Sequence, residues 1–181
     1  MTTPQFILDL RQSVGHTLLW LNGITAYVVR EDGRILLGRR SDTGEWAMVY
    51  GINEPGEEPA DTTAREVKEE TGVDVIVTDL VSIKSSNKPI VYANGDQTMY
   101  MDMSFICKPD PAGNIEPFVG DDESLSVGWF DPSNLPQPLA ASTLERLELI
   151  HQYLANASHG DRHALFFGGQ GSQDAPSSQT A

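Results

Sequence analysis

The segment from Arg65 to Gly72 constrains this chain more than any other, because it places Glu66, Glu69 and Glu70 on one side of a predicted helix. At about 100° of turn per residue, the three side chains fall within an arc of about 100°. Glu66 meets Glu70 at i,i+4 and Glu69 at i,i+3, and each like-charged pair costs about 0.2–0.5 kcal/mol. Glu69 and Glu70 also lie just before Gly72, the expected C-terminal cap, where the helix dipole disfavours each anion by roughly 0.3–1 kcal/mol. A solvated amphipathic helix, the simplest alternative, usually alternates the signs of its charges instead.

A bound cation explains why this crowding is tolerated. Without a counter-ion the pattern costs on the order of 1–3 kcal/mol, and a divalent cation among the carboxylates reverses the sign of these terms. Oxygen ligands suit a hard ion, so the sequence predicts Mg2+, with Mn2+ as the alternative. The opposite side of the helix is expected to pack on the core through Ala60, Ala64, Val67 and Thr71.

Length and charge limit the classes of partner. The 181 residues suit one domain with a substantial core, and the formal net charge of -14 opposes binding to a nucleic-acid backbone or an anionic membrane. A small phosphorylated substrate is compatible with this charge, because a metal ion changes the local sign. The single cysteine, Cys107, excludes an intramolecular disulfide, and no run of 18 apolar residues occurs. We expect a cytoplasmic protein that binds neither nucleic acid nor membrane.

Apolar periodicity and turn residues predict a mixed order of helices and strands. A first helix is expected to begin at Pro4, with Thr3 as its N-cap, and to end at Gly15. The acidic helix is expected to have Pro59 in its first turn. Strands are expected over 18–21, 24–30, 34–39, 46–50, 73–83, 98–107 and 125–130, with tight hairpins at 32–33 and 94–95. A capping box opens the last helix at Ser142, and its predicted inward residues are Leu144, Leu147, Ile150 and Leu154.

This order predicts three parts of the chain. Residues 1–16 form an N-terminal helical segment packed on the domain, and residues 17–157 form the domain itself. Residues 158–181 form a tail that we expect to be disordered at least from about residue 168, because it lacks apolar content.

The acidic helix and the loop before it resemble the Nudix box, G-x5-E-x7-R-E-U-x-E-E-x-G-U, in which U is aliphatic. All specified positions match: Gly51, Glu57, Arg65, Glu66, Val67, Glu69, Glu70, Gly72 and Val73. The resemblance extends to Gly44 and Trp46 before the box and to 127–130 after it, and covers roughly residues 18–155. The fold that it implies is α/β, a Nudix-type α/β/α sandwich around a mixed β-sheet.

The resemblance also implies an activity, the Mg2+-dependent hydrolysis of the diphosphate linkage in a nucleoside diphosphate joined to another group. Such substrates include nucleotide sugars, ADP-ribose and nucleoside triphosphates. Carried over from the family, Glu66 and Glu70 are metal ligands together with Glu69, and Glu57 can reach the same place from its loop. Arg65 is expected to pair with Glu57 or another carboxylate of the box and to hold it in a fixed rotamer.

The general base is not identified by the box. Glu69 and Glu70 are candidates, and Glu123 is a third, because relatives often place an acid just before the last strand. A carboxylate near the metal can accept a proton from the attacking water. The alternative for Glu123 is a turn made soluble by its charges.

Three further residues are candidates for contact with the substrate. Arg39 and Arg40 lead out of a predicted strand, and a guanidinium matches phosphate oxygens, although pairing with neighbouring acids is the competing interpretation. Tyr50 occupies the position directly before Gly51. Many relatives carry the dipeptide Pro-Gly before this glycine, whereas this chain has Val49 and Tyr50. This departure predicts an altered substrate pocket.

Two other functions fit the same fold. One is a binding module that senses a nucleotide, and the intact acidic cluster argues against it. The other is an enzyme like isopentenyl-diphosphate isomerase, whose site uses a cysteine upstream of the box. Cys107, the single cysteine of this chain, lies downstream of the box on a predicted core strand, which argues against this alternative. The sequence does not identify the small-molecule substrate. Because related folds often form dimers, a homodimer is one of the expected oligomeric states.

Overall fold

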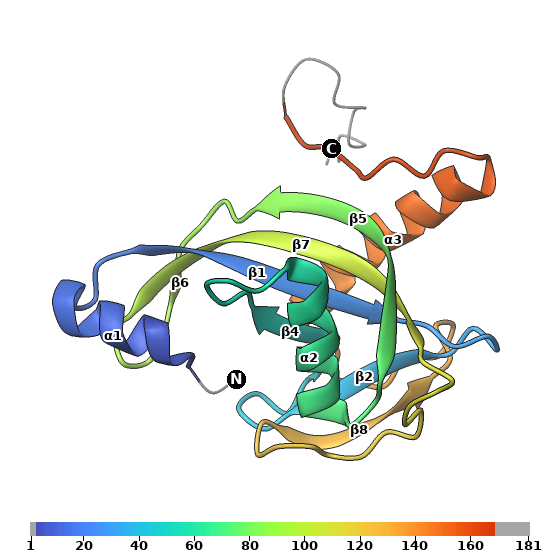
Figure 1. Ribbon diagram of the computed structural model, residues 1–181, viewed down its shortest axis with the longest axis horizontal. Coiled ribbons are helices and arrows are strands. Elements are labelled where there is room, and N and C mark those ends of the chain that lie inside the picture. Colours follow the sequence, from blue (N-terminus) through green and yellow to red (C-terminus); the bar gives the residue numbers. More distant parts are fainter. Residues whose placement is uncertain (1–2, 169–181) are drawn as a thin grey trace, which may run out of the picture.

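The computed structural model describes residues 3–168, and the tail predicted to be disordered lies almost entirely outside these residues. Figure 1 shows the course of the chain. The helices and strands are α1 Gln5–Val14, β1 Leu19–Val28, β2 Ile35–Arg40, β3 Trp46–Ala47, β4 Val49–Ile52, α2 Pro59–Thr71, β5 Val75–Ser85, β6 Ile90–Val91, β7 Gln97–Pro109, β8 Ser124–Phe130 and α3 Ala141–Ser158.

The strands form two sheets. The larger sheet has the order β4-β1-β7-β5, with β6 beside β7, and the smaller one has the order β3-β2-β8. β1 and β7 run parallel, while the other pairs are antiparallel. A mixed sheet was predicted, and the structure confirms it while dividing the strands between two sheets.

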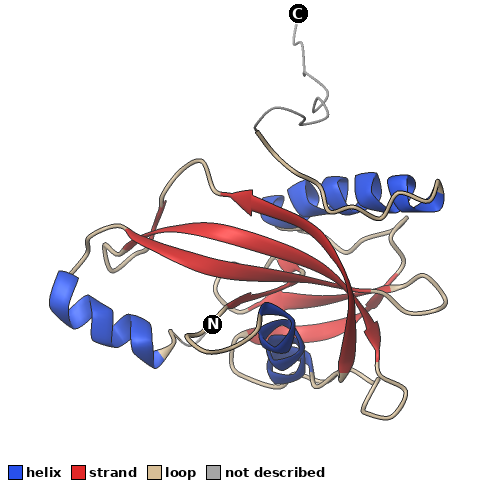
Figure 2. Cartoon of the chain, turned by 45° about the horizontal axis from the view of Figure 1, so that its top comes forward, coloured by secondary structure: helices blue, strands red, loops and turns tan. Residues whose placement is uncertain are grey.

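Helices α2 and α3 cover opposite faces of the larger sheet. Ile24 of β1 belongs to a buried cluster with Val67 of α2. Tyr27, three residues further along β1, belongs to another cluster with Ile150 of α3. Side chains separated by an odd number of residues point to opposite faces of a strand. Figure 2 shows the two helices on opposite sides of the strands, so the predicted α/β/α sandwich is confirmed.

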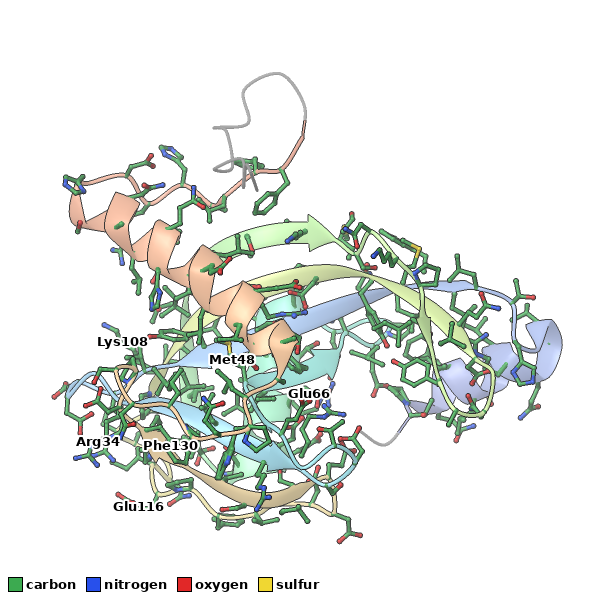
Figure 3. All side chains as sticks on the ribbon, turned by 180° about the vertical axis from the view of Figure 1, so that it is seen from behind. Arg34, Met48, Glu66, Lys108, Glu116 and Phe130 are labelled. Atoms are coloured by element: carbon green, nitrogen blue, oxygen red, sulfur yellow. The ribbon has the colours of Figure 1, made fainter. Side chains whose placement is uncertain are left out.

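Two strand predictions need correction. The segments 18–21 and 24–30 form one strand, β1, because its whole length pairs with β7 in an unbroken register from Leu19 opposite Thr98 to Val28 opposite Cys107. The segment 46–50 instead divides between β3 and β4, which belong to different sheets. The break is at Met48, whose N–H donates to the Thr143 hydroxyl of α3 at 3.2 Å. Figure 3 shows Met48 beneath α3.

Both predicted hairpin turns form around a glycine in the left-handed region. Gly33 has a φ of 84° and Gly95 a φ of 89°, values that side chains with a Cβ rarely adopt. The second turn joins β6 to β7. After the first turn, a single bridge between Val29 and Ile35 is followed by divergence, since β2 pairs with β8 and not with β1.

Helix α1 packs on the domain through fewer residues than the sequence predicts. It begins at Gln5, with Pro4 as its N-cap and without a side-chain cap from Thr3. Ile7 is buried and packs with Leu21 and Ile52. The apolar spacing of the sequence puts Leu10 and Val14 on the same face as Ile7, yet 43% of Leu10 and 40% of Val14 are exposed.

Helix α3 contradicts the predicted capping box. It begins at Ala141 with Ala140 as N-cap and no side-chain cap. Ser142 lies within the first turn, where its hydroxyl faces the Tyr50 hydroxyl at 3.2 Å. The tertiary partner thus takes the group that would have capped the helix.

The buried side of α3 also differs from the prediction. Leu147 and Ile150 are buried as expected, together with Thr143 and Tyr153. In contrast, 51% of Leu144 and 39% of Leu154 are exposed. The helix is rotated relative to the predicted stripe because Thr143 and Tyr153 use their hydroxyls inside the domain.

The chain stays in contact with the domain after α3. The N–H of Leu165 donates to the Val81 carbonyl at 2.7 Å, and the Leu165 side chain is buried. This contact protects part of the edge strand β5. None of the helices between residues 3 and 168 has the length and apolar character needed to span a bilayer.

Two leucines of α3 provide a matched test of this packing. Leu147→Ala should lower the free energy of unfolding by about 2–5 kcal/mol, because the buried side chain leaves a cavity. Leu144→Ala should change it by about 0.5 kcal/mol or less, since half of that side chain is already exposed. Urea unfolding followed by circular dichroism measures both. Equal losses would mean that α3 packs through the stripe read from the sequence.

Candidate active site

Helix α2 buries one of the acidic residues that the sequence analysis placed opposite the side expected to pack on the core. Glu66 is only 8% exposed, and it shares the inner side with Val67 and Thr71. Ala60, predicted to pack inward, is exposed. The helix ends as predicted at Gly72, which has a φ of 71° and donates its N–H to the Lys68 carbonyl. The acidic side of α2 therefore faces into the domain at Glu66.

Glu66 lies against the backbone of β4. A Cβ added to Gly51 would approach the Glu66 side chain, with 2.7 Å to its Oε1 and closer contacts to its carbons. Such distances do not occur between real atoms, so only glycine leaves room for Glu66 here. The N–H of Ile52, the next residue, also hydrogen-bonds to the Glu66 carboxylate. The box glycine thus positions a carboxylate on the neighbouring helix.

The Arg65 guanidinium joins three carboxylates of the box. Its Nε and Nη2 donate to the two oxygens of Glu57 at 2.8 and 3.0 Å. Its Nη1 donates to Glu66 Oε1 at 3.1 Å and to Glu69 Oε2 at 3.0 Å. Arg65 lowers the pKa of Glu57 to about 2, with a smaller contribution from Thr62. The expected pairing of Arg65 with Glu57 is present.

Two residues that the sequence analysis did not single out hold Glu57 from its other side. The Thr62 hydroxyl donates to Glu57 Oε2 at 2.8 Å, and Asn53 donates its amide to the Thr62 oxygen at 2.6 Å. Both occupy unspecified positions of the box. A polar residue at such a position carries no sequence signal, because only the fold brings it to the carboxylate.

The positive charges near Glu66 and Glu70 do not offset the cost of burying these two carboxylates. Burial raises the pKa of Glu66 to about 6 against the opposing effect of Arg65. Burial raises the pKa of Glu70 to about 8, and the nearby charges of Glu66 and Asp121 add to the shift. Both carboxyls are therefore harder to ionise in the metal-free protein than in water.

A loop between β7 and β8 carries Glu123 to the C-terminal end of α2. The N–H groups of Phe118 and Gly120 donate to the carbonyls of Thr71 and Glu70 at 2.9 and 3.1 Å. These bonds satisfy two carbonyls that the end of the helix leaves without partners. Gly120 also touches the Glu69 carbonyl so closely that a Cβ would not fit.

The far end of this loop is fixed as well. The N–H of Ser41, which follows β2, donates to the Glu123 carbonyl at 2.7 Å. Glu123 is therefore attached to the smaller sheet, while Gly120 is attached to α2. This arrangement brings an acid distant in sequence to the box helix.

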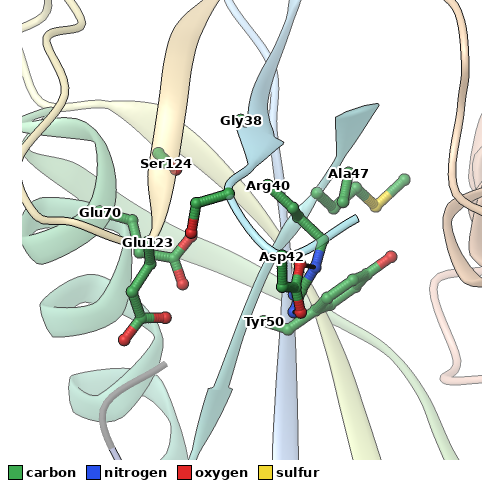
Figure 4. A pocket seen from close by; sticks show the side chains of 10 residues that line it. Gly38, Arg40, Asp42, Ala47, Tyr50, Glu70, Glu123 and Ser124 are labelled. Carbon is green, nitrogen blue, oxygen red and sulfur yellow. Dashed lines mark hydrogen bonds and ion pairs between the residues drawn. The ribbon is translucent and has the colours of Figure 1, made fainter. Parts of the chain in front are cut away.

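A pocket of about 240 Å3 lies between these elements. Its lining residues are Gly38, Arg40, Ser41, Asp42, Ala47, Met48, Tyr50, Glu70, Glu123 and Ser124. Figure 4 shows Glu70 and Glu123 on one side of the pocket and Tyr50, Arg40 and Asp42 on the other. Four of the residues singled out from the sequence therefore share one pocket.

The two arginines at the end of β2 have different surroundings. Arg40 lines the pocket, and its Nε and Nη2 donate to the two oxygens of Asp42 at 2.9 and 2.6 Å. Arg39 is absent from the pocket lining and donates to the Gly44 carbonyl at 3.0 Å. The contacts of Arg40 match the competing interpretation, pairing with a nearby acid, and those of Arg39 hold the turn after β2.

Tyr50 is fixed at both ends of its side chain. Its hydroxyl lies 2.8 Å from the Thr143 hydroxyl and 3.2 Å from that of Ser142. The Arg146 guanidinium covers the ring, with 4.7 Å between Cζ and the ring centroid. Arg146 is a third residue that sequence reasoning missed, because a lone arginine on a surface helix gives no signal.

The carboxylates fit a hard divalent cation by their chemistry. Glu66 and Glu70 are buried oxygen donors with raised pKa values, so a cation between them would relieve both burial and repulsion. Within residues 3–168, no group of three or more acidic, histidine or cysteine side chains already converges on one point. Arg65 accounts for this, since it draws Glu57 and Glu69 to its own guanidinium.

Cys107 is not a nucleophile in this structure. It is fully buried on β7, and burial raises the pKa of its thiol to about 12. The predicted position of Cys107 on a core strand is confirmed. Cys107 is not among the residues that line the pocket.

Glu70→Gln tests the charge imbalance without metal. A carboxyl with a raised pKa stabilises the fold fully below its ordinary pKa of 4.5 and loses that contribution as the pH rises through about 8. Metal-free Glu70→Gln should therefore be more stable than the wild type at pH 8 by roughly 1–3 kcal/mol. Near pH 4.5 the two proteins should unfold alike. Urea titrations in a chelator measure this, and a pH-independent difference would contradict it.

Comparisons with known proteins identify the family of this chain. A sequence profile of the NUDIX domain matches residues 20–153. A MutT-like protein of Streptomyces ambofaciens is 36% identical over 118 residues, which cover 65% of this chain and 68% of that protein. An 8-oxo-dGDP phosphatase of Homo sapiens is 30% identical over 162 residues, which cover 86% of this chain and 45% of that protein.

A solved structure supports the same assignment. The crystal structure of a MutT NUDIX hydrolase from Burkholderia pseudomallei has a TM-score of 0.58 and 29% sequence identity, and the match covers 73% of this chain and 98% of that chain. The present chain spans less than half the length of the human relative. The profile covers most of the sequence and includes the complete box, the pocket and α3 up to Tyr153. The chain therefore belongs to the Nudix family and is a Nudix hydrolase.

Proposed function

We propose that this hydrolase uses Mg2+ to cleave the diphosphate linkage of a nucleoside diphosphate joined to another group. The observation that carries the proposal is that Glu70 of the box and Glu123 line one pocket, with Arg40 and Tyr50 across from them. A site with two carboxylates on one side and a guanidinium and an aromatic ring on the other suits a substrate that contains a diphosphate and a planar base. The name of the human relative, an 8-oxo-dGDP phosphatase, supports this substrate class.

Glu66, Glu69 and Glu70 are the residues that would hold Mg2+, with Mn2+ as the alternative ion. Glu66 is fixed by its contact with Gly51, and Glu70 lies one helical turn further along. Glu57 is the fourth candidate ligand, but both of its oxygens hydrogen-bond to Arg65. Its participation would require those bonds to be exchanged.

The bound ion would neutralise phosphoryl charge and lower the pKa of a water molecule. The chain's own residues orient the site. Arg65 holds Glu57 and Glu69 at fixed positions, which limits the movement of the acidic cluster. Arg40 lines the pocket with its guanidinium on Asp42, and it can turn its donors toward a phosphate if that pair opens.

Glu123 is our preferred general base. A base must be able to accept a proton from the attacking water, and Glu70 is less available for this role because it is a proposed ligand of the ion. Glu69 is 54% exposed and bonded to Arg65, so it is less available to a water molecule in the pocket. Glu123 lines the pocket directly and is held by its backbone contact with Ser41.

A homodimer and a cytoplasmic location stay proposals from the sequence. Exposed apolar side chains near the N-terminal helix support self-association, among them Leu8, Leu10 and Trp20, which is 54% exposed. Light scattering in solution would decide the oligomeric state.

Turnover by a single-site variant tests the proposed function. The Mg2+-loaded protein should release a nucleoside monophosphate from at least one compound in a panel of ADP-ribose, sugar nucleotides, dinucleoside polyphosphates and normal or oxidised nucleotides. Glu70→Gln should reduce that rate by roughly three orders of magnitude or more, because it removes a proposed ligand. Glu148→Gln, an exposed acid of α3, is the matched control and should keep full activity. Undiminished turnover in Glu70→Gln would remove this residue from the mechanism.

Binding of the metal alone gives a second test, independent of any substrate. Mg2+ at millimolar concentration should raise the melting temperature of the wild type, because it binds the folded chain preferentially. Glu66→Gln should remove most of this rise, whereas Glu148→Gln should not. Calorimetry that found no Mg2+ binding to the wild type would contradict the assigned ligands.

A further inference from the structure

A buried polar network lies beneath Tyr50, and the mechanism above does not use it. Arg146 of α3 donates from Nε to the Thr25 hydroxyl at 2.7 Å and from Nη1 to the Ser142 carbonyl at 3.2 Å. Its Nη2 forms an ion pair with Asp102 at 3.2 Å. The Arg146 side chain is 23% exposed and that of Asp102 16%. All three nitrogens of the guanidinium are therefore held by the domain.

The partners of Arg146 are held as firmly as Arg146 itself. The Thr25 hydroxyl, fully buried, lies 3.0 and 3.1 Å from the two Asp102 oxygens. The Ser104 hydroxyl donates to Asp102 at 3.1 Å. Thr25 faces Ser104 on β7 and Tyr50 on β4, so these side chains share one face of the sheet. The network thus ties β1, β4 and β7 to the start of α3.

The network ends at the ring of Tyr50. The guanidinium covers the ring at 4.7 Å, a cation–π contact, while the hydroxyl is bound by Thr143 at 2.8 Å. Arg146 and the first turn of α3 therefore fix both the plane and the rotation of the ring. The ring is only partly buried and lines the pocket.

A tyrosine needed only for packing looks different in the same protein. Tyr153 of α3 is 1% exposed, donates its hydroxyl to Asp79 at 2.9 Å and is absent from the pocket lining. Tyr50 combines a comparable hydroxyl contact with a ring that borders the site.

We propose that Tyr50 is the stacking surface for the nucleobase of the substrate and that Arg146 is the positioning residue that holds its ring in place. This inference rests on the proposed function for its substrate class. Figure 4 places Tyr50 across the pocket from Glu70 and Glu123, where the phosphates are proposed to lie. A substrate with charged phosphates and a planar base matches these two sides. A ring already fixed before binding loses little conformational entropy when the base stacks on it.

An arginine is required at this position by geometry. A planar fork reaches Thr25, Ser142 and Asp102 at once and leaves its flat face on the ring, whereas a lysine offers a single ammonium group. Arg146→Lys keeps the charge and should still release the ring. This distinction separates positioning from a simple need for positive charge.

Binding of products tests the proposal without turnover. Calorimetry with the Mg2+-loaded full chain would compare nucleoside 5′-monophosphates carrying each of the four bases with ribose 5-phosphate, which lacks a base. Tyr50→Leu should weaken binding of the preferred nucleotide about 5- to 150-fold, the range for loss of one base–aromatic stack, and leave ribose 5-phosphate unchanged. Tyr50→Phe keeps the ring and should stay within about threefold of the wild type. An equal loss for both ligands in Tyr50→Leu, or no loss, would overturn the stacking role.

The role of Arg146 is tested through Tyr50. Arg146→Met and Arg146→Lys should weaken nucleotide binding selectively, raising KM for the hydrolysed substrate with little change in kcat. Adding Arg146→Met to Tyr50→Leu should produce no further selective loss, because the ring is already gone. Arg162→Met, an exposed arginine paired with Asp79 outside the pocket, is the matched control. A full additional loss in the double variant would show that Arg146 acts independently and would overturn its positioning role.

These outcomes are distinct from failure of the proposed function. Selective nucleotide binding that depends on Tyr50, without hydrolysis of any diphosphate in the panel, would refute the proposed function and support the stacking surface. Hydrolysis with an unchanged KM in Tyr50→Leu would support the proposed function and refute the stacking surface. Near-ultraviolet circular dichroism of each variant confirms that the fold is kept, and Tyr50→Phe supplies the comparison if Tyr50→Leu does not fold.

Discussion

The site depends on repulsion among the glutamates of α2 and on the single guanidinium that partly offsets it. Arg65 binds both oxygens of Glu57 and one oxygen each of Glu66 and Glu69. It does not reach Glu70, and the pKa of that carboxyl stays raised to about 8. The helix therefore carries a charge imbalance at its C-terminal end, which tertiary packing maintains and a bound cation would remove.

Packing around the helix determines where this charge is presented. Gly51 lets Glu66 lie against β4, since any Cβ would occupy the space of the carboxylate. The loop after β7 donates two backbone N–H groups to the end of α2 and brings Glu123 to the pocket that Glu70 lines. Glycine at these contacts therefore serves the site directly, because it permits close approach between backbone and side chain.

The network around Arg146 depends on parts of the chain that are distant in sequence. Local helix geometry places Glu66, Glu69 and Glu70 of the box near one another along α2, so their order follows from their spacing. Tyr50 is held by α3 and by two strands that are far away in sequence, through Arg146, Thr25 and Asp102. Under the proposed stacking role of Tyr50, substitutions in α3 and β7 would change binding of the base without any change in the box.

The sequence by itself determined the acidic helix, its capping glycine, both hairpin turns and the family, because spacing along one helix or turn fixes these features locally. It misjudged the first turn of α3, where the Ser142 hydroxyl meets Tyr50 and the Thr143 hydroxyl accepts from Met48, and neither caps the helix. It also placed Glu66 opposite the side expected to pack on the core, although α2 buries that residue against Gly51. Only the tertiary structure decided which polar groups meet across the sheet, since a pairing such as Arg146 with Asp102 depends on the register of strands distant in sequence.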